Sequence, residues 1–423
     1  MSGAGGRGGP GPGKGKGKGR GKGPAGRRAL SNLGGTVRVR EGGDPALSAH
    51  LKVMMEAASG TIERFTHGFH TYPARMHPDL AAEGVERLSR PGARVLDPFC
   101  GSGTVLIEAR AQGRPSAGVD LNPLALRVAE VCTAVRGEAA RARFLDHAGR
   151  VVDASLERVR GRVRVRAPLS VRERAFYPPH VLLELAGLFE EICTVADAPD
   201  RRALEVVFSA LLVKFSRQRG DTSAQLVDKR IRKGLVSEFF LRKAGELAER
   251  WAALTEATPR PPPPVTLREG DARELREALG SRARFDLILT SPPYGGTYDY
   301  HDHHARRYPW LGIDPRRFEQ REVGARRHLS QAAGAHARWD RELGGCLSSM
   351  AAVSKRDAYL VLLLGDAELD GRRVDAAEQV ERLAPRAGLE LRAAVSQPRR
   401  DARGGPRRRE HLLLLSTARA SSE

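Results

Sequence analysis

The sequence predicts an α/β protein with a seven-stranded, largely parallel sheet, an inserted helical subdomain and a disordered basic N-terminal arm. Apolar runs of strand length alternate with helical patterns over residues 45–136, and this alternation resumes over 259–423. Residues 137–258 show almost only helical patterns. Residues 1–44 are rich in Gly, Pro and Lys, so they bury too little apolar surface to fold. We therefore predict four segments: an arm, two halves of one core, and an insertion between the halves.

The first strong motif is a glycine turn between a strand and a helix. Residues 94–104 read RVLDPFCGSGT and run directly into a helical pattern. Gly101 and Gly103 allow the backbone to turn sharply and to approach a ligand closely. The next strand, residues 114–120, ends in Asp120, whose carboxylate can accept hydrogen bonds from ribose hydroxyls. The pattern favours a nucleotide-type pocket.

Two other interpretations of this turn are an ordinary strand-to-helix connection and a dinucleotide dehydrogenase. The second would require a third glycine on the helix, where this chain has Leu106. A glycine pair alone does not distinguish an ordinary strand-to-helix connection from a binding site.

A second motif follows the strand predicted at residues 285–290. Ser291, Pro292, Pro293 and Tyr294 form a stiff loop, because two prolines fix φ. An exocyclic amine on a nucleobase is a weak nucleophile, because the ring delocalises its lone pair. The Ser291 side chain and the Pro292 carbonyl are suited to accept its two N–H groups and so free the lone pair. Tyr294 could stack on a base that has been flipped out of a helix. A rigid surface turn is the alternative interpretation.

Together, the two motifs resemble those of the S-adenosylmethionine (SAM)-dependent DNA amino-methyltransferases, the N4-cytosine/N6-adenine DNA methylase family. Asp-Pro-Phe-x-Gly-x-Gly-Thr resembles motif I, and Ser-Pro-Pro-Tyr resembles the motif of enzymes that methylate exocyclic amines. Residues 65–78, FTHGFHTYPARMHP, resemble motif X, which precedes motif I. The resemblance covers about residues 66–136 and 265–416. It implies the class I SAM-dependent methyltransferase (Rossmann-like) fold and SAM as cofactor, whereas the insertion before the third strand departs from the family pattern.

The resemblance also assigns roles to individual residues. Gly101 and Gly103 would face the cofactor, Asp120 would bind its ribose, Asp271 its adenine amine, and the motif X segment with Arg75 its methionine carboxylate. The complete predicted cofactor set is Thr71, Tyr72, Asp97, Phe99, Gly101, Gly103, Thr104, Asp120 and Asp271. The predicted catalytic residues are Ser291, Pro292, Pro293 and Tyr294, and no metal is expected.

The sequence contains two groups of residue types that often bind metals, a histidine cluster and four cysteines, and we expect neither to form a metal site. His301, His303 and His304 are close together, but neighbours on one loop seldom converge on one ion. We expect these histidines and the neighbouring aromatic residues, Tyr298 and Tyr300, to line the base pocket or the nucleic-acid face. The four cysteines form no C-x-x-C pair, so neither a zinc site nor a disulfide framework is expected, which suits a reducing cytoplasm.

The charge distribution favours a polyanionic partner. Residues 1–40 carry +10 of the net +20, and the body of the chain is basic as well. The stretch 214–233 is the candidate for contacts to a substrate backbone, although a solvated loop would read the same way. Arginines between 399 and 409 suggest a basic hairpin. No membrane-span or signal-peptide pattern is present, and the oligomeric state is left open.

These observations predict a SAM-dependent, site-specific DNA methyltransferase that acts on an exocyclic amine. Ser rather than Asp at position 291 favours cytosine N4. Adenine N6 in DNA, a guanine N2 or adenine amine in RNA, and a non-catalytic nucleic-acid-binding protein are the alternatives. The sequence gives neither the recognition site nor the presence of a partner restriction enzyme.

Overall fold

The computed structural model describes residues 35–58, 63–72, 75–221, 225–330, 334–399 and 408–418. The predictions for residues 1–34 of the arm, and for the arginines at 400 and 407, lie outside this part of the chain. No helix in the described ranges is long and apolar enough to cross a membrane.

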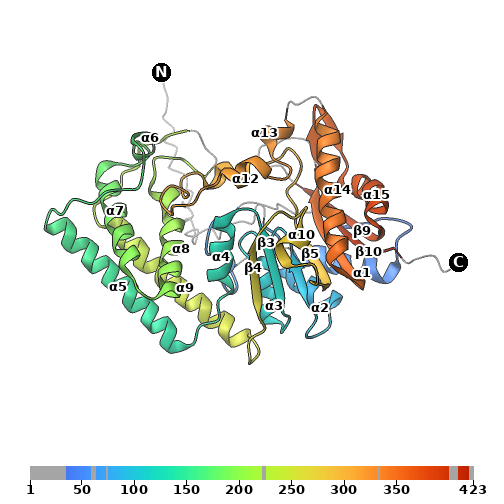
Figure 1. Ribbon diagram of the computed structural model, residues 1–423, viewed down its shortest axis with the longest axis horizontal. Helices are drawn as coiled ribbons and strands as arrows, with labels where there is room; N and C mark the ends of the chain where they lie inside the picture. The colour runs from blue at the N-terminus through green and yellow to red at the C-terminus, as the bar shows by residue number, and fades with distance from the viewer. Residues whose placement is uncertain are drawn as a thin grey trace, which may run out of the picture.

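The core is an eight-stranded mixed sheet with the order β1-β9-β10-β6-β5-β2-β3-β4 (Figure 1). Strands β2 to β6 pair in parallel with their neighbours, and β10 runs antiparallel to both β6 and β9. Strand β10 therefore runs opposite to the parallel strands of the sheet. The strands are β1 (Arg38–Val39), β2 (Val95–Asp97), β3 (Ser116–Asp120), β4 (Val265–Glu269), β5 (Phe285–Thr290), β6 (Ser354–Gly365), β9 (Leu389–Arg399) and β10 (Arg408–Thr417), with a separate pair β7 (Ala367–Leu369) and β8 (Arg372–Val374).

The sequence predicted seven strands and an arm that ends at residue 44. Both predictions were wrong, because the last ten residues of that arm add a strand to the sheet. Residues 35–44 belong to the fold, and β1 is the eighth strand, pairing Arg38 with Ser396. The open edge of β9 explains this, since Arg40 and Asp44 donate backbone N–H groups to carbonyls of that strand. Asp44 also caps the next helix by accepting from two backbone N–H groups.

Helices cover the two faces of the sheet in separate apolar clusters. One face packs on α1 (Pro45–Ala57), α2 (Pro78–Leu88) and α3 (Thr104–Ala111). The other face packs on α10 (Leu275–Leu279), α14 (Ala335–Val353) and α15 (Ala376–Leu383), which is followed by the 3-10 turn Ala384–Ala387. Along β6, Val361 and Leu363 enter the first cluster while Leu360 and Leu362 enter the second. This alternation places the strand in the middle of a three-layer core.

A third apolar cluster holds the predicted helical segment together beside α4 (Pro123–Thr133) (Figure 1). The helices are α5 (Glu138–Arg160), α6 (Val171–Arg174), α7 (Pro179–Thr194), α8 (Ala198–Phe215) and α9 (Leu235–Ala257). Four helices were predicted here, over residues 151–160, 180–196, 201–215 and 235–253, and α6 was not predicted. Helix α5 begins 13 residues earlier than Val151, its predicted start. The division into domains at residues 136 and 258 stays a prediction.

The segment that follows β5 crosses from the sheet to this helical cluster. Its short helices are α11 (Tyr300–His304), α12 (Arg316–Arg321) and α13 (Arg326–Leu329). Trp310 is fully buried among the helices and donates its indole N–H to the Tyr177 hydroxyl at 3.2 Å. The segment is therefore fixed at its middle, and its ends lie next to the carboxyl ends of the central strands.

Candidate active site

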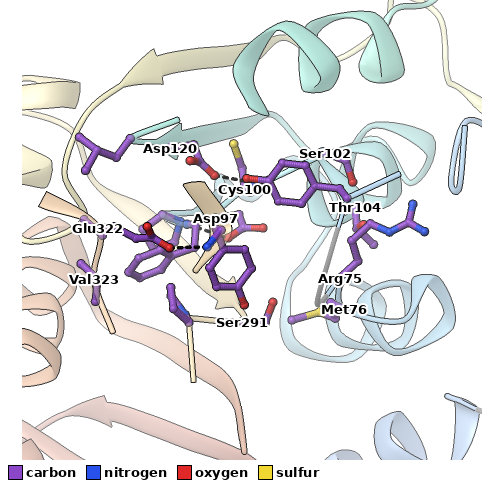
Figure 2. Close-up of a pocket in the computed structure, with 18 of the residues that line it drawn as sticks. Arg75, Met76, Asp97, Cys100, Ser102, Thr104, Asp120, Ser291, Glu322 and Val323 are labelled. Carbon is purple, nitrogen blue, oxygen red and sulfur yellow. Dashed lines mark hydrogen bonds between the residues drawn. The ribbon is translucent and has the colours of Figure 1, made fainter. Parts of the chain in front are cut away.

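One pocket lies at the carboxyl ends of β2, β3, β4 and β5, where open parallel sheets bind ligands. In Figure 2, Arg75 and Met76 lie on one side of this pocket and Glu322 and Val323 on the other, with Ser291 across from Asp120. The full lining is Tyr72, Arg75, Met76, Asp97, Pro98, Phe99, Cys100, Gly101, Ser102, Thr104, Asp120, Leu121, Gly270, Asp271, Ala272, Ser291, Pro293, Tyr300, Phe318, Glu322 and Val323. Residues separated by more than two hundred positions in the chain thus share one cavity.

The glycine turn is shaped by Asp120. Its Oδ2 accepts the Gly101 backbone N–H at 2.9 Å and its Oδ1 accepts that of Asn122 at 2.8 Å. Burial raises the pKa of Asp120 to about 6 in spite of these hydrogen bonds. Each carboxylate oxygen has two acceptor positions, so the side chain keeps capacity for a ligand's hydroxyls.

Asp97 is the second carboxyl group of the pocket and is almost completely buried. Its Oδ1 accepts the Thr290 hydroxyl at 2.6 Å and the Phe99 backbone N–H at 3.1 Å. Burial is the main cause that raises its pKa to about 7, against the lowering effect of these two bonds. The bond to Thr290 fixes the end of β5 to the end of β2, directly before Ser291.

Tyr72 lies over the glycine turn. A Cβ atom at Gly101, where φ is +49°, would lie 3.0 Å from the Tyr72 ring, so only glycine fits this close approach. Arg75 and Met76 continue the same wall. Thr71 does not line the pocket; its backbone carbonyl lies 3.0 Å from Nδ1 of His70. Residues 73 and 74 of this predicted segment lie outside the described residues.

Gly103 does not line the pocket either, although the resemblance placed it at the cofactor. It begins α3 with φ of +86°, and a Cβ atom there would lie 3.3 Å from that of Ala129 on α4. Its structural role is the close packing of two helices, whereas Gly101 and Thr104 line the cavity.

Asp271 lines the pocket, but its carboxylate is already heavily hydrogen-bonded. Oδ1 accepts from the backbone and the Nε of Arg273, both at 2.9 Å. Oδ2 accepts the Arg273 Nη2 at 2.6 Å and lies 3.0 Å from Nη2 of Arg321. Burial would raise the pKa of Asp271, but these partners hold it below the usual value. A contact to an adenine amine would have to replace one of these four interactions.

The Ser-Pro-Pro-Tyr loop is divided between the pocket and the core. Ser291 and Pro293 line the pocket, whereas Pro292 is buried outside the lining. Tyr294 is also outside the lining and only 6% exposed, with its hydroxyl donating to Glu410 on β10. The Tyr294 ring packs against the backbone of β6 at Gly365 and does not line the pocket. In this arrangement it cannot stack on a base in the pocket, as was predicted.

Four lining residues come from the segment after the Ser-Pro-Pro-Tyr loop, which contributed no residue to the predicted cofactor and catalytic sets: Tyr300, Phe318, Glu322 and Val323. All lie between residues 296 and 339, a stretch rich in arginine. Glu322 is 2% exposed and accepts the backbone N–H of Tyr300 at 2.6 Å. Tyr300 belongs to the aromatic residues that were expected at the base pocket, whereas no periodic pattern marked Phe318, Glu322 or Val323.

The histidines after the loop are packed with aromatic rings. The His304 ring is 1% exposed, and its centroid lies 4.8 Å from that of Tyr72. Burial, with Arg307 nearby, lowers the pKa of His304 well below its usual value. The basic stretch of the helical segment is partly engaged as well, because Lys229 donates to carbonyls of α8 and Arg232 pairs with Glu238.

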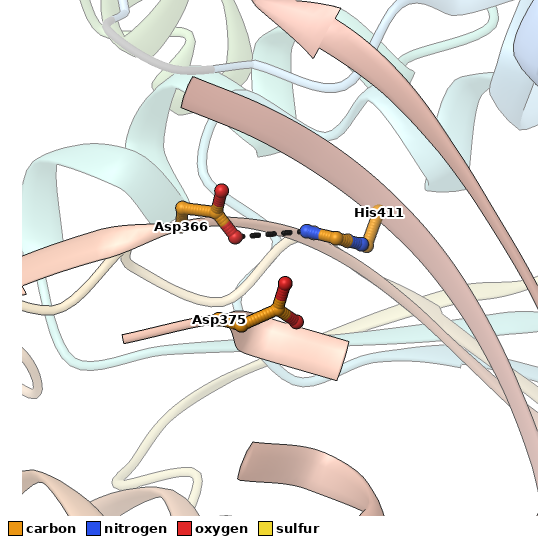
Figure 3. Close-up of side chains that lie close together, drawn as sticks. All are labelled: Asp366, Asp375 and His411. Atoms are coloured by element: carbon orange, nitrogen blue, oxygen red, sulfur yellow. Dashed lines mark hydrogen bonds and ion pairs between the residues drawn. The ribbon is translucent and has the colours of Figure 1, made fainter. Parts of the chain in front are cut away.

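Outside the pocket, Asp366, Asp375 and His411 come together in a group that could hold a metal by proximity alone (Figure 3). His411 Nε2 donates to Asp366 at 2.8 Å, and Arg373 Nη2 also donates to Asp366, at 2.5 Å. Asp375 accepts two backbone N–H groups at the start of α15. Since these carboxylates already have donors and a guanidinium lies beside them, the group acts as a clamp between β6, α15 and β10.

The glycine turn, its two carboxyl groups and the position at the strand ends define the class: a nucleotide-type binding site in an α/β sheet. A model of the DNA methylase family for N6 and N4 methylation matches residues 52–131. That segment contains motif X, the glycine turn and Asp120, but it ends before Ser291. The predicted resemblance to the N4-cytosine/N6-adenine DNA methylases is thus confirmed for residues 52–131, and the cofactor of that family is SAM.

Two relatives share short segments with this chain. Type II methyltransferase M.MvaI of Kocuria varians is 42% identical over 74 residues, which are 17% of this chain and 16% of the relative. Type II methyltransferase M.MjaII of Methanocaldococcus jannaschii is 35% identical over 68 residues, 16% of this chain and 13% of the relative. The matches span less than a fifth of each relative.

Two solved structures are similar over more of the chain. TrmN from Thermus thermophilus has a TM-score of 0.32 and 15% identity, covering 81% of this chain and 49% of its own. The rRNA methyltransferase aviRa from Streptomyces viridochromogenes has a TM-score of 0.34 and 14% identity, covering 85% and 92%.

The pocket has the chemical features that SAM requires. Asp120 offers carboxylate oxygens for ribose hydroxyls, and Gly101 and Thr104 line the cavity beside it. Phe99, Val323 and Phe318 supply apolar walls for a ring. Arg75 adds a cation on the motif X side, where the methionine carboxylate would lie.

Proposed function

We propose that this protein transfers a methyl group from SAM to the exocyclic amine of a nucleobase in DNA, with cytosine N4 favoured. One observation carries the proposal: Ser291 lines the same pocket as Asp97, Gly101 and Asp120. A methyl donor held by the glycine turn and an amine held by the Ser291 loop would therefore meet in one cavity. The segment match to the DNA methylase family supports DNA as the substrate.

The residues of this chain would act by positioning. SAM, when bound, supplies a methyl group that is already activated for transfer. The Ser291 hydroxyl would accept one N–H group of the amine, which turns its lone pair toward the methyl group. The family resemblance implies the Pro292 carbonyl as acceptor of the second N–H group, although Pro292 is outside the pocket lining in this structure. The Asp97–Thr290 hydrogen bond would keep this loop in register with the glycine turn. Such alignment of two reactants lowers the barrier without a covalent enzyme intermediate.

The preference for cytosine N4 depends on residue 291. Ser occupies the position where an Asp would favour adenine N6 by the family resemblance. The serine hydroxyl is a neutral acceptor and donor, whereas an aspartate would add a negative charge beside the base. The assay below distinguishes the two bases directly.

The test is the transfer of labelled methyl from SAM to duplex DNA, single-stranded DNA and total RNA, with the modified nucleoside identified by mass. N4-methylcytosine in DNA is the expected product. N6-methyladenine in DNA would correct the base and keep the mechanism, and label in RNA alone would contradict DNA as the substrate. No transfer to any of the three would contradict the enzymatic function.

The Ser291→Ala variant tests the role of the loop. We expect its turnover to fall by about a hundredfold, the scale of losing one positioned hydrogen-bond partner in a transition state, while its SAM affinity stays near that of the wild type. Ser281→Ala, on an exposed turn, is the matched control. Equal losses of turnover and SAM binding in Ser291→Ala would mean that Ser291 is structural.

A further inference from the structure

Tyr294 is fixed in place by the C-terminal hairpin. Its hydroxyl donates to Glu410, and the Arg399 guanidinium lies 5.2 Å from the ring centroid. A Cβ atom at Gly365 would lie only 2.7 Å from the ring, so the ring rests directly on the β6 backbone. Rotation into the pocket would leave the Glu410 carboxyl buried without its partner, at a cost typical of an unsatisfied polar group.

Tyr300 has the position that Tyr294 lacks. It lines the pocket together with Ser291 and Pro293, and it is partly exposed. Its ring meets that of Tyr298 edge-on, with the centroids 5.7 Å apart. An aromatic ring in the same pocket as the residue that would hold the amine is suited to stack on the base that carries the amine.

Two anchors hold Tyr300 in this position. Glu322 accepts the Tyr300 backbone N–H at 2.6 Å and is itself held by Arg327 Nη1 at 2.6 Å. The backbone N–H of Arg327 donates to Asp299 at 2.9 Å, directly before Tyr300. The ring is therefore carried on a backbone that is fixed from both sides, and Glu322 acts as the positioning residue. Pre-organisation of this kind lowers the entropy cost of stacking.

We propose that Tyr300, positioned by Glu322, stacks on the target base, and that Tyr294 instead anchors the catalytic loop to β10 through Glu410. This inference rests on the proposed function. It assigns base stacking to a residue six positions beyond the one that the motif indicates.

The experiment compares Tyr300→Ala, Tyr300→Phe and Tyr294→Phe in steady-state methylation of plasmid DNA from a methylation-deficient host. Base–aromatic stacking contributes about 1–3 kcal/mol, so Tyr300→Ala should lower kcat/KM for DNA by roughly 10- to 100-fold. Tyr300→Phe keeps the ring and should stay within about threefold of the wild type. The SAM affinity of both variants, measured by calorimetry, should be unchanged.

Tyr294→Phe keeps its ring but loses the bond to Glu410. We expect a lower Tm from this variant, with KM for DNA unchanged. Glu322→Gln should raise the KM for DNA, because it weakens the interactions of residue 322 with Arg327 and with the Tyr300 backbone N–H. Tyr300→Phe leaves these interactions in place and should not raise the KM. If Tyr300→Ala fails to fold, Tyr300→Leu replaces it, since leucine fills most of the space without an aromatic face.

Three outcomes would overturn the inference. A Tyr300→Ala variant with unchanged kcat/KM would show that the ring is not used, and an equal loss of SAM affinity would make Tyr300 part of the cofactor wall. A large rise in the KM for DNA in Tyr294→Phe would return the stacking role to Tyr294. If the wild type itself transfers no methyl group to DNA, the proposed function fails first and this inference falls with it.

Discussion

The pocket and the clamp around Asp366 both bury carboxyl groups, but the pKa values of these groups are shifted in opposite directions. Asp97 and Asp120 have few donors for their burial, and their pKa values are raised to about 7 and about 6. Burial would also raise the pKa of Asp366, yet His411, Arg373 and the Arg409 backbone N–H lower it to about 2. Figures 2 and 3 show the two surroundings.

The difference separates a site that is available to a ligand from one that stabilises the fold. A carboxylate with unused acceptor positions costs folding free energy, and a ligand with hydroxyl donors recovers that energy on binding. A carboxylate with all its donors supplied within the chain gains nothing from a ligand. The same residue type therefore serves binding in one place and stability in the other.

The largest expected effect comes from breaking the clamp. Asp366→Asn leaves His411 and Arg373 without their buried anion, so we expect the free energy of unfolding to fall by about 3–5 kcal/mol. Urea unfolding followed by circular dichroism measures this, with Asp357→Asn on the exposed part of β6 as the control. A loss under about 1 kcal/mol would mean that the clamp is not a stabilising element.

Removal of the pocket carboxylate should act on binding rather than on stability. Asp120→Asn keeps one oxygen but loses the charge that would hold the ribose hydroxyls, so the SAM affinity should fall by about tenfold, equal to ~1.4 kcal/mol. Its free energy of unfolding at pH 8 should stay at or above that of the wild type, because a buried charge is removed. Calorimetric titration and urea unfolding test the two parts, and a destabilised Asp120→Asn would contradict the contrast with Asp366.

The pH dependence sharpens the comparison further. Since the folded pKa of Asp120 is raised from 3.8 to about 6, its contribution to stability is fully present below pH 3.8 and is lost as the pH rises through 6. SAM binding should show the opposite trend, since the ionised form is the better acceptor, and should weaken as the pH falls below 6. The difference in SAM affinity between the wild type and Asp120→Asn, measured from pH 5.5 to 8, should shrink toward the acid end.

The smallest expected effect concerns divalent cations. A cation at Asp366, Asp375 and His411 would have to displace the Arg373 guanidinium and the two backbone donors of Asp375. We therefore expect Mn²⁺ or Zn²⁺ to leave the Tm unchanged, because only a ligand that binds the native state raises it. A saturable rise in Tm that Asp366→Asn abolishes would reveal a metal site.

The sequence alone determined the elements whose signals are local. Gly101 marks its turn because few other residues adopt its backbone conformation, and β6 is recognisable as an unbroken apolar run. Asp120, at the end of one predicted strand, and Ser291, directly after another, were predicted as a cofactor-binding and a catalytic residue. Both line the pocket.

The tertiary structure decided what each neighbouring side chain touches. Gly103 packs on α4, Asp271 pairs with Arg321 from another segment, and Tyr294 turns toward Glu410 on β10. Glu322 reaches the pocket only because the segment after β5 folds back over the strand ends. These positions depend on partners 22 to 116 residues away, and a local pattern carries no information about a partner that only folding brings near.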